Sequence, residues 1–278
     1  MHFWHTTDGP LLYAHRGASR ECPENTLPAF ERALELGADV LELDVHPTRD
    51  GVFVVSHDAT AARVAGVDRA ISESSWGEVS RWDAGAGFVD ERGARPFAGT
   101  GVRFARFDEV LARFRDVAVN VDVKDARPLD LERLLSIVRE AKAESRVLLT
   151  SFSYRVLSRL RALGYSGAVG LSQLDVVRLV FSPSLFDRLF PYGGVRAQIP
   201  TRSGPIDLTA PRLFAKCKRL AIGVDYWVVN DPVVAASLLE HGADGIITDD
   251  PRAIAEVFRT SRRTAAWRAR HAAAPSRG

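Results

Sequence analysis

Short apolar runs alternate with segments of helical periodicity along almost the whole chain, a pattern typical of the strands and crossover helices of a parallel α/β sheet. Eight runs predict strands, at 11–15, 40–46, 118–124, 147–152, 168–172, 195–199, 225–230 and 245–248. Helical segments between them include 26–36, 108–114, 129–143, 155–163, 211–221, 232–240 and 251–259. Eight repeats with mostly short connections favour a closed TIM (β/α)8 barrel over an open doubly wound sheet, which usually has fewer strands and a glycine-rich first turn.

One stretch interrupts this rhythm. Residues 52–56 predict an additional short strand, and residues 58–103 are rich in glycine, arginine and small side chains without sustained periodicity. We interpret 58–103 as an insertion after the second strand of a barrel domain that spans 1–258. It would emerge at the carboxyl-terminal rim, where it could form a lid or wall over a substrate; a solvated irregular loop is the alternative.

Length and composition agree with an ordinary globular domain, because 46% of the 278 residues are hydrophobic and 26% are charged. The longest uncharged stretch, 162–174, is too short to cross a bilayer, which needs about 20 apolar residues. The first residues lack the basic and apolar regions of a secretory signal. We therefore expect no transmembrane segment and a cytoplasmic protein. Cys22 and Cys217 are too few for a disulfide framework and are expected to be reduced.

Positive charge is concentrated at one end of the chain. The net charge is +2, but residues 259–278 hold six arginines and no acid, so residues 1–258 are mildly acidic. Nucleic-acid binding is therefore not predicted. The tail 259–278 is expected to be disordered or a frayed helix. Trp267 among its arginines would suit peripheral contact with a membrane surface or a partner, and a tail without specific contacts is the alternative.

Two acids share one face of the second strand. Side chains alternate along a strand, so Glu42 and Asp44 point to one side and the aliphatic residues to the other. Two buried carboxylates side by side repel each other and lose hydration, so they need a cation or must give up a charge. A divalent metal, Mg²⁺ or Ca²⁺, suits such hard oxygen ligands. Salt bridges to arginine are the alternative, and this pattern alone favours neither.

The third strand adds another acid and a lysine. The same alternation places Asp122 and Lys124 on one side of 118–124. If both polar faces point to the barrel axis, Glu42, Asp44 and Asp122 form three sides of one metal site with Lys124 beside it. A lysine next to a carboxylate-bound metal suits an anionic substrate such as a phosphate.

Two histidines close strand ends. His15 ends the first strand and precedes Arg16, and His57 follows the additional strand. Imidazole titrates near neutrality, so two histidines across a substrate can supply a general base and a general acid. Arg16 adds a planar cation suited to phosphate oxygens. Asp58 could orient a histidine or cap a turn. The other histidines are expected to have surface or core positions: His2, His5, His46, His241 and His271.

These residues occur in an order that resembles the glycerophosphodiester phosphodiesterase family. The early motifs are His15-Arg16-Gly17-Ala18, Pro23-Glu24-Asn25-Thr26, Gly37-Ala38-Asp39, Glu42-Leu43-Asp44-Val45, Asp50-Gly51 and His57-Asp58. The later motifs are Val121-Asp122-Val123-Lys124, Thr150-Ser151-Phe152, Trp227-Val228-Val229-Asn230 and the run 242–249. The resemblance covers roughly 11–258, and the ordered early cluster makes it specific.

The resemblance implies a TIM-barrel enzyme with a divalent metal, Mg²⁺ or Ca²⁺, that splits a glycerophosphodiester into glycerol 3-phosphate and an alcohol. Carried over by position, the catalytic acid/base pair would be His15 and His57, and the metal ligands would be Glu42, Asp44 and Asp122. The residues that bind substrate would be Arg16 and Lys124 at the phosphate and Trp227 at the glycerol. Supporting positions beside the first loop are expected for Glu24 and Asn25.

The resemblance also suggests that the nucleophile is the substrate's own glycerol 2-hydroxyl, giving a cyclic phosphate that water opens later. We assign His15 as the base and His57 as the acid, and the reverse assignment is the alternative. Asp122 stands where the family often has glutamate, and Val228 replaces a usual threonine, so the metal and the released alcohol are left open.

Two other functions compete with this interpretation. A related lysophospholipase D or sphingomyelinase D type of barrel acts on choline phospholipids by cyclisation, and an apolar cleft beside Trp227 would support a lysophospholipid substrate. A catalytically silent barrel that acts as a binding module should have lost acid/base or metal residues, and none is lost here.

Overall fold

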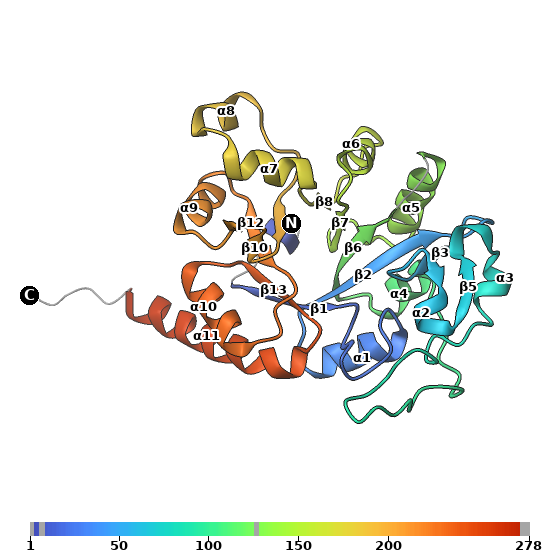
Figure 1. Ribbon diagram of the computed structural model, residues 1–278. Helices are drawn as coiled ribbons and strands as arrows, with labels where there is room; N and C mark the ends of the chain where they lie inside the picture. Colours follow the sequence, from blue (N-terminus) through green and yellow to red (C-terminus); the bar gives the residue numbers. More distant parts are fainter. Residues whose placement is uncertain (1–2, 6–8, 125–127, 273–278) are drawn as a thin grey trace, which may run out of the picture.

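The structure is a computed structural model that describes residues 3–5, 9–124 and 128–272. Eight parallel strands form one sheet in the order β8-β7-β6-β2-β1-β13-β12-β9. Their bounds are Leu11–His15 (β1), Val40–Pro47 (β2), Ala118–Val123 (β6), Val147–Thr150 (β7), Ala168–Val169 (β8), Arg196–Ile199 (β9), Gly223–Tyr226 (β12) and Gly245–Thr248 (β13). The sheet curls into a nearly closed barrel with helices outside it (Figure 1), which confirms the predicted TIM fold.

The barrel closes in two different ways. The first and last strands, β1 and β13, pair along their length. The edge strands β8 and β9 instead meet at one bridge between Gly170 and Arg196, and the Leu171 N–H donates to the Arg196 carbonyl at 2.8 Å. A Cβ atom on Gly194 would lie 2.4 Å from the Gly170 carbonyl oxygen, so this seam requires glycine for close backbone approach.

The helices around the barrel follow their strands closely. They are α1 (Leu27–Glu35), α4 (Phe107–Arg113), α5 (Pro128–Glu140), α6 (Tyr154–Ala162), α9 (Pro211–Arg219), α10 (Pro232–His241) and α11 (Pro251–Ala272). Side-chain caps fix several starts: Thr26 accepts a hydrogen bond from the Ala29 N–H at 3.4 Å, and Asp231 accepts one from Val233 at 2.7 Å. All seven predicted helices are present.

The barrel interior contains a buried ion pair. Arg196 of β9 and Asp225 of β12 are almost fully buried and joined by two hydrogen bonds, of which the one from Nε is 2.9 Å long. The hydroxyl of Tyr13 donates to the same carboxylate at 3.1 Å. A buried charge must be matched by a partner, so these residues fix the neighbouring strands together.

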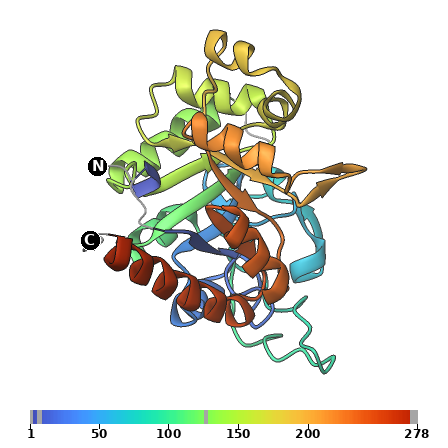
Figure 2. The same cartoon turned by 90° about the vertical axis from the view of Figure 1, so that its left-hand side faces the viewer.

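Two helices and a hairpin in the second half of the chain are not among the predicted elements. Helices α7 (Gln173–Phe181) and α8 (Ser184–Leu189) form the connection from β8 to β9 and stand above the rim of the barrel (Figures 1 and 2). A hairpin of β10 (Arg202–Ser203) and β11 (Ile206–Asp207) projects from the body in Figure 2. Helix α7 carries apolar side chains on two sides, and Asp175 and Arg178 lie between them.

The insertion is only partly an irregular loop. The predicted additional strand exists as β3 (Phe53–Val55) and pairs antiparallel with β2. The insertion then forms β4 (Thr60–Ala61), α2 (Ala62–Ala65), β5 (Val67–Ala70), the turn η2 (Ile71–Glu73) and α3 (Trp76–Val79). Side chains of this part pack in one apolar cluster with β3, whereas residues 91–101 are mostly exposed turns. Its first half is therefore a small packed unit.

The carboxyl-terminal segment is helical over most of its length. Helix α11 continues to Ala272, so of the two forms expected for the tail from 259, disordered or a frayed helix, the structure shows a helix over 259–272. Alanine and arginine, which dominate this segment, are strong helix formers. Residues 273–278 and the side chain of Trp267 lie outside the described part of the chain, so membrane contact by the tail stays a prediction. Within the described residues, no helix combines the length and apolarity that spanning a bilayer requires.

Candidate active site

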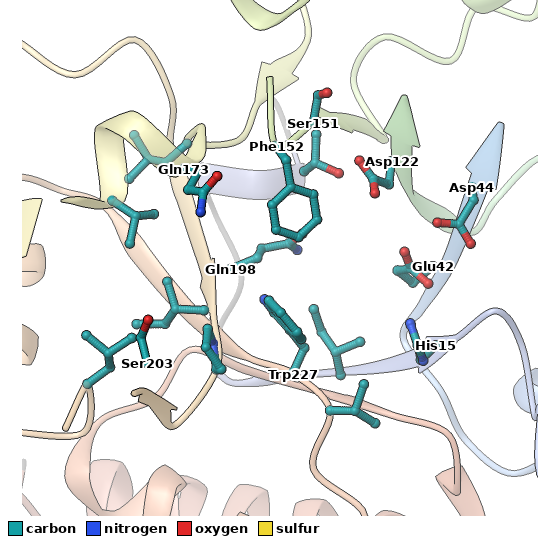
Figure 3. A pocket seen from close by; sticks show the side chains of 18 of the residues that line it. His15, Glu42, Asp44, Asp122, Ser151, Phe152, Gln173, Gln198, Ser203 and Trp227 are labelled. Atoms are coloured by element: carbon teal, nitrogen blue, oxygen red, sulfur yellow. The ribbon is translucent and has the colours of Figure 1, made fainter. Parts of the chain in front are cut away.

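A cavity of about 440 Å³ opens at the carboxyl-terminal ends of the strands, where active sites of TIM barrels form. The predicted site residues that line it are His15, Arg16, Glu42, Asp44, His57, Asp122, Lys124 and Trp227. In Figure 3, His15 and the three acids lie on one side, and Phe152 and Trp227 stand between them and Gln173. The cavity therefore has a charged half and an apolar half.

Strand register brings the charged residues together. In the pairing of β1 with β2, His15 lies opposite Glu42. In the pairing of β2 with β6, Asp44 lies opposite Asp122. Residues in register on parallel strands share a face of the sheet, so all four side chains point into the same space. The alternation in the sequence predicts this juxtaposition.

His15 is anchored by a chain of hydrogen bonds from the last strand. Its Nδ1 lies 2.6 Å from Oδ1 of Asp249, which follows β13, and Asn230 donates to the other oxygen of Asp249 at 2.9 Å. With Asp249 on Nδ1, the Nε2 atom is free to act in the cavity. Burial alone would lower the pKa of His15, but the hydrogen bond to Asp249 and the charge of Glu42 raise it.

His57 has an equivalent carboxylate partner from its own strand end. Its Nδ1 lies 2.7 Å from Oδ1 of Asp58, and Arg63 donates to the other oxygen of Asp58 at 2.7 Å. Burial by itself would raise the pKa of Asp58, but the hydrogen bonds from Arg63 and His57 lower it below its ordinary value. Of the two roles expected for Asp58, the structure shows the contact with a histidine. Arg63 also donates to both oxygens of Glu24, at 2.7 and 2.8 Å.

Burial and mutual repulsion perturb the three acids. Glu42, Asp44 and Asp122 are each less than a tenth exposed. Burial and the charge of Asp44 raise the pKa of Glu42 to about 7, and burial also raises the pKa of Asp122. Burial by itself would also raise the pKa of Asp44, but the charges of Lys124 and Arg16 lower it below its ordinary value. The three acids therefore do not titrate alike: burial favours the protonated forms of Glu42 and Asp122, whereas the adjacent cations favour the ionised form of Asp44.

Lys124 lies between two of these acids. Its Nζ is 2.6 Å from Asp122 and 2.9 Å from Asp44, and Nε of Arg16 is 3.5 Å from Asp44. Of these contacts, the one between Arg16 and Asp44 is a salt bridge to arginine, the alternative expected to a metal, whereas the other two are made by a lysine. Within the described residues, no set of three His, Cys, Asp or Glu side chains is arranged around a metal position. The chemistry of the donors still fits a hard divalent cation, because they are three buried carboxylates, and burial of Glu42 next to the charge of Asp44 raises its pKa.

The first loop holds Arg16 against the acids. The Arg16 N–H donates to Glu42 at 3.0 Å, and its guanidinium donates to Glu24 at 3.1 Å. Asn25 donates to Asp44 at 3.0 Å. Glu24 and Asn25 thus do not line the cavity themselves, but each contacts residues that do. This is the arrangement expected of supporting residues.

The apolar half comes from segments that the sequence did not single out. Its walls include Val176, Val177, Val180 and Phe181 of α7, together with Ile206 and Leu208 around β11. The rings of Phe152 and Trp227 meet edge to face between the two halves, with centroids 6.1 Å apart. The cavity therefore includes the apolar cleft beside Trp227 that a lysophospholipid would require.

Sequence reasoning did not identify Asp249 and Asn230 as site residues. Both belong to quoted motifs, and Asp249 directly follows the last strand of a predicted barrel. In a closed barrel the last strand lies beside the first, so an acid at that position is expected to reach a histidine that ends the first strand. That signal was available. The α7 wall had no comparable signal.

Comparison with known proteins adds independent evidence. The Glycerophosphoryl diester phosphodiesterase family matches residues 15–253. A glycerophosphodiester phosphodiesterase of Caldanaerobacter subterraneus is 33% identical over 254 residues, which cover 90% of this chain and 98% of that protein. A lysophospholipase D of Rattus norvegicus is 27% identical over 87% of this chain and 84% of its own length. The crystal structure of a glycerophosphodiester phosphodiesterase from Agrobacterium tumefaciens matches with a TM-score of 0.74 and 25% identity, over 90% of this chain and 99% of that one.

Proposed function

This chain belongs to the glycerophosphoryl diester phosphodiesterase family, and we propose that it hydrolyses glycerophosphodiesters to glycerol 3-phosphate and an alcohol. One observation carries the proposal. His15 and His57, each with an aspartate on Nδ1, line a single cavity with the cations Arg16 and Lys124. A phosphodiester needs a base, an acid and neutralisation of its charge, and this set of groups can supply all three.

In the proposed reaction the two histidines divide the proton transfers. Nε2 of His15 removes the proton of the substrate's glycerol 2-hydroxyl, and that oxygen attacks phosphorus. The bond between phosphorus and the alcohol oxygen breaks, and His57 donates a proton to the leaving oxygen. Asp249 and Asp58 hold the two rings in orientation and stabilise their protonated forms.

A second step completes the hydrolysis. The first step leaves a cyclic phosphate, a neutral His57 and a protonated His15. His57 takes a proton from water, the water oxygen attacks phosphorus, and His15 returns its proton to the 2-oxygen as the ring opens. Glycerol 3-phosphate leaves, and both histidines regain their starting forms.

The remaining site residues bind the substrate and a cation. Arg16 and Lys124 bind the phosphate oxygens, and Trp227 forms the wall on the glycerol side. Glu42, Asp44 and Asp122 would hold a divalent cation, Mg²⁺ or Ca²⁺, which when bound supplies Lewis-acid stabilisation of the phosphate charge. With a cation bound among these acids, Lys124 would also be released from its ion pairs with Asp44 and Asp122.

Product release tests the proposal. Purified protein is incubated with glycerophosphocholine, glycerophosphoethanolamine or glycerophosphoinositol, in Mg²⁺, in Ca²⁺ and in chelator, and glycerol 3-phosphate is measured. His15→Ala should lose about 10²- to 10⁴-fold in rate. His241→Ala is the matched control, because His241 is an exposed residue near the end of α10. If no diester releases glycerol 3-phosphate under any condition, the proposal is wrong; lysophospholipids are tested next, and a silent binding barrel is favoured if they are also left uncleaved.

The apolar half of the cavity favours a second candidate substrate, a lysophospholipid. Its glycerophosphate would occupy the charged half, while its acyl chain would lie along Val177, Val180 and Phe181 of α7. A diester with a small polar head group makes no use of this wall. The protein would then act as a lysophospholipase D and would use the same catalytic residues.

A ratio of two activities tests the second candidate. Val177→Asp places a charge in the apolar wall, and we expect kcat/KM for lysophosphatidylcholine to fall at least about tenfold. The value for glycerophosphocholine should change much less. Val89→Asp, at an exposed valine of the insertion, is the control. The lysophospholipid hypothesis is contradicted if Val177→Asp lowers kcat/KM equally for both substrates, or if the unmodified protein does not cleave lysophosphatidylcholine.

A further inference from the structure

Helix α7 carries apolar side chains on two sides, with polar residues between them, although it lies at the surface. One side lines the cavity through Val176 and Val180. Leu174, Val177 and Phe181 recur at spacings of three and four residues, which places them along one stripe of the helix, and each is at least half exposed. The solvent side of a surface helix is usually polar, so this exposed apolar stripe indicates a surface that contacts something else.

Helix α8 extends this apolar surface. Phe186 and Leu189, one turn apart, and Phe190 just after the helix are also at least half exposed. Arg178 of α7 holds the segment in place, because it donates to the Phe190 carbonyl at 2.8 Å and stacks on Tyr192 at 3.8 Å from the ring centre. We define the rim patch as the six exposed side chains of Leu174, Val177, Phe181, Phe186, Leu189 and Phe190.

The rim patch is continuous with the cavity. Val177 and Phe181 belong to the patch and also line the cavity wall. Phe152, which precedes α6, is exposed as well and contacts Trp227 inside the cavity. An apolar path therefore runs from the outer surface of α7 and α8 to the middle of the site.

Exposed charge on the segment that carries the rim patch is positive. The acids of 152–192 are Asp175 and Asp187, and both are buried. Asp175 caps α7 with Ser172, and Asp187 pairs with Lys216. Arg155 at the start of α6 and Arg212 at the start of α9 are exposed, and within the described residues neither has an ion-pair partner. Over 152–192 the apolar patch is therefore accompanied by positive charge, and an exposed acid, Asp207, occurs only later, on β11.

We propose that the rim patch docks the protein onto a lipid bilayer that contains anionic phospholipids, with the cavity mouth next to the membrane. Apolar side chains insert at the level of the head groups, and Arg155 and Arg212 interact with the anionic lipids. A second copy of the chain fits less well, because pairing two such rims would bring like charges together. Docking does not depend on which diester the cavity cleaves.

Vesicle binding by the full chain tests this proposal. The protein is sedimented with vesicles of phosphatidylcholine alone and of phosphatidylcholine with phosphatidylglycerol. We expect binding to the anionic vesicles, weakened at least about tenfold by the double variant Phe186→Asp/Leu189→Asp. Val89→Asp, a matched exposed valine in the insertion, should bind like the unmodified protein. Arg155→Gln should weaken binding about fivefold, on anionic vesicles only.

Two further measurements separate the possible failures. Neither Phe186 nor Leu189 lines the cavity, so the double variant should hydrolyse dissolved glycerophosphocholine at the unmodified rate, which also shows that it is folded. The proposal is wrong if the unmodified protein stays in the supernatant with both vesicles, or if the double variant sediments normally. It is also wrong if light scattering reveals a dimer that the double variant dissociates. Loss of diester hydrolysis with vesicle binding intact would instead overturn the proposed function.

Discussion

His15 and Asp249 lie 234 positions apart in the chain, yet Nδ1 of His15 is 2.6 Å from Oδ1 of Asp249. The contact exists because β1 pairs with β13, which sets the ends of the first and last strands side by side. The proposed base and the carboxylate that orients it therefore come from opposite ends of the sequence.

Removing the charge of Asp249 should impair the reaction while leaving substrate binding nearly intact. We expect Asp249→Asn to lower kcat by about 10²- to 10⁴-fold with little change in KM, because the ring of His15 loses its orienting acceptor. Steady-state kinetics measure this. Ser19→Ala is the control, because it removes the hydrogen bonds of the Ser19 hydroxyl to Asp249 (3.3 Å) and to the His15 carbonyl (3.0 Å) but leaves the carboxylate of Asp249 on Nδ1. A loss confined to KM would show that Asp249 does not orient the base.

Leaving-group dependence should distinguish the two histidines. If His57 is the acid, His57→Ala should be severely impaired on glycerophosphocholine but recover on glycerophospho-p-nitrophenol, whose leaving group departs without a proton. His15→Ala should stay impaired on both substrates. Rates on the two diesters measure the effect. Recovery by His15→Ala in place of His57→Ala would reverse the assignment.

Metal binding should stabilise the protein through its acids. Mg²⁺ or Ca²⁺ at a hundredfold excess over Kd should add about 2.7 kcal/mol to the free energy of unfolding and raise the melting temperature. Glu42→Gln and Asp122→Asn should abolish both this shift and the metal-dependent activity. Asp207→Asn, at an exposed acid of β11, should keep both. An unchanged shift in the first two variants would place the metal elsewhere.

The ion pair inside the barrel should matter for stability. Asp225→Ala leaves the buried guanidinium of Arg196 without its carboxylate, and we expect a loss of about 3–5 kcal/mol in the free energy of unfolding. Urea denaturation measures this loss. Glu256→Ala removes an exposed partner of Arg259 and should cost almost nothing. Similar losses of stability in both variants would mean that burial of the ion pair does not determine the size of the loss.

Acid should weaken the attachment of α8. Burial by itself would raise the pKa of Asp187, but hydrogen bonds from Ser182, Tyr192 and Lys216 lower it below its ordinary value of 3.8. The ionised carboxylate therefore stabilises the fold above pH 3.8, and this contribution disappears as the pH falls through the lowered pKa. Asp187→Asn should be less stable than the unmodified protein near neutrality, by urea denaturation, and the difference should shrink in acid. A difference independent of pH would exclude the charged form as its source.

The barrel and the charged half of the site could be predicted from the sequence because both depend on regular alternation. Glu42, Asp44 and Asp122 sit on strands of period two, so their shared face follows from the pattern. Lys124 shows the limit of such reasoning. Alternation places it near the acids, but only the structure shows that it pairs with two of them.

The remaining features depend on contacts that a linear pattern does not contain. Helix α7 carries apolar side chains on two sides, so its pattern does not show which side lines the cavity, and the helix over 259–272 follows from residue propensity rather than patterning. The partnership of Asp249 with His15 requires closure of the barrel. The expected cytoplasmic location and absence of nucleic-acid binding stay predictions.

The pairing of β1 with β13 also has a consequence during synthesis. A ribosome releases the chain in order, so His15 emerges long before Asp249. Until β13 has left the exit tunnel, it cannot pair with β1, and His15 lacks its carboxylate partner. We therefore expect the proposed site to be assembled only after β13 has emerged from the ribosome.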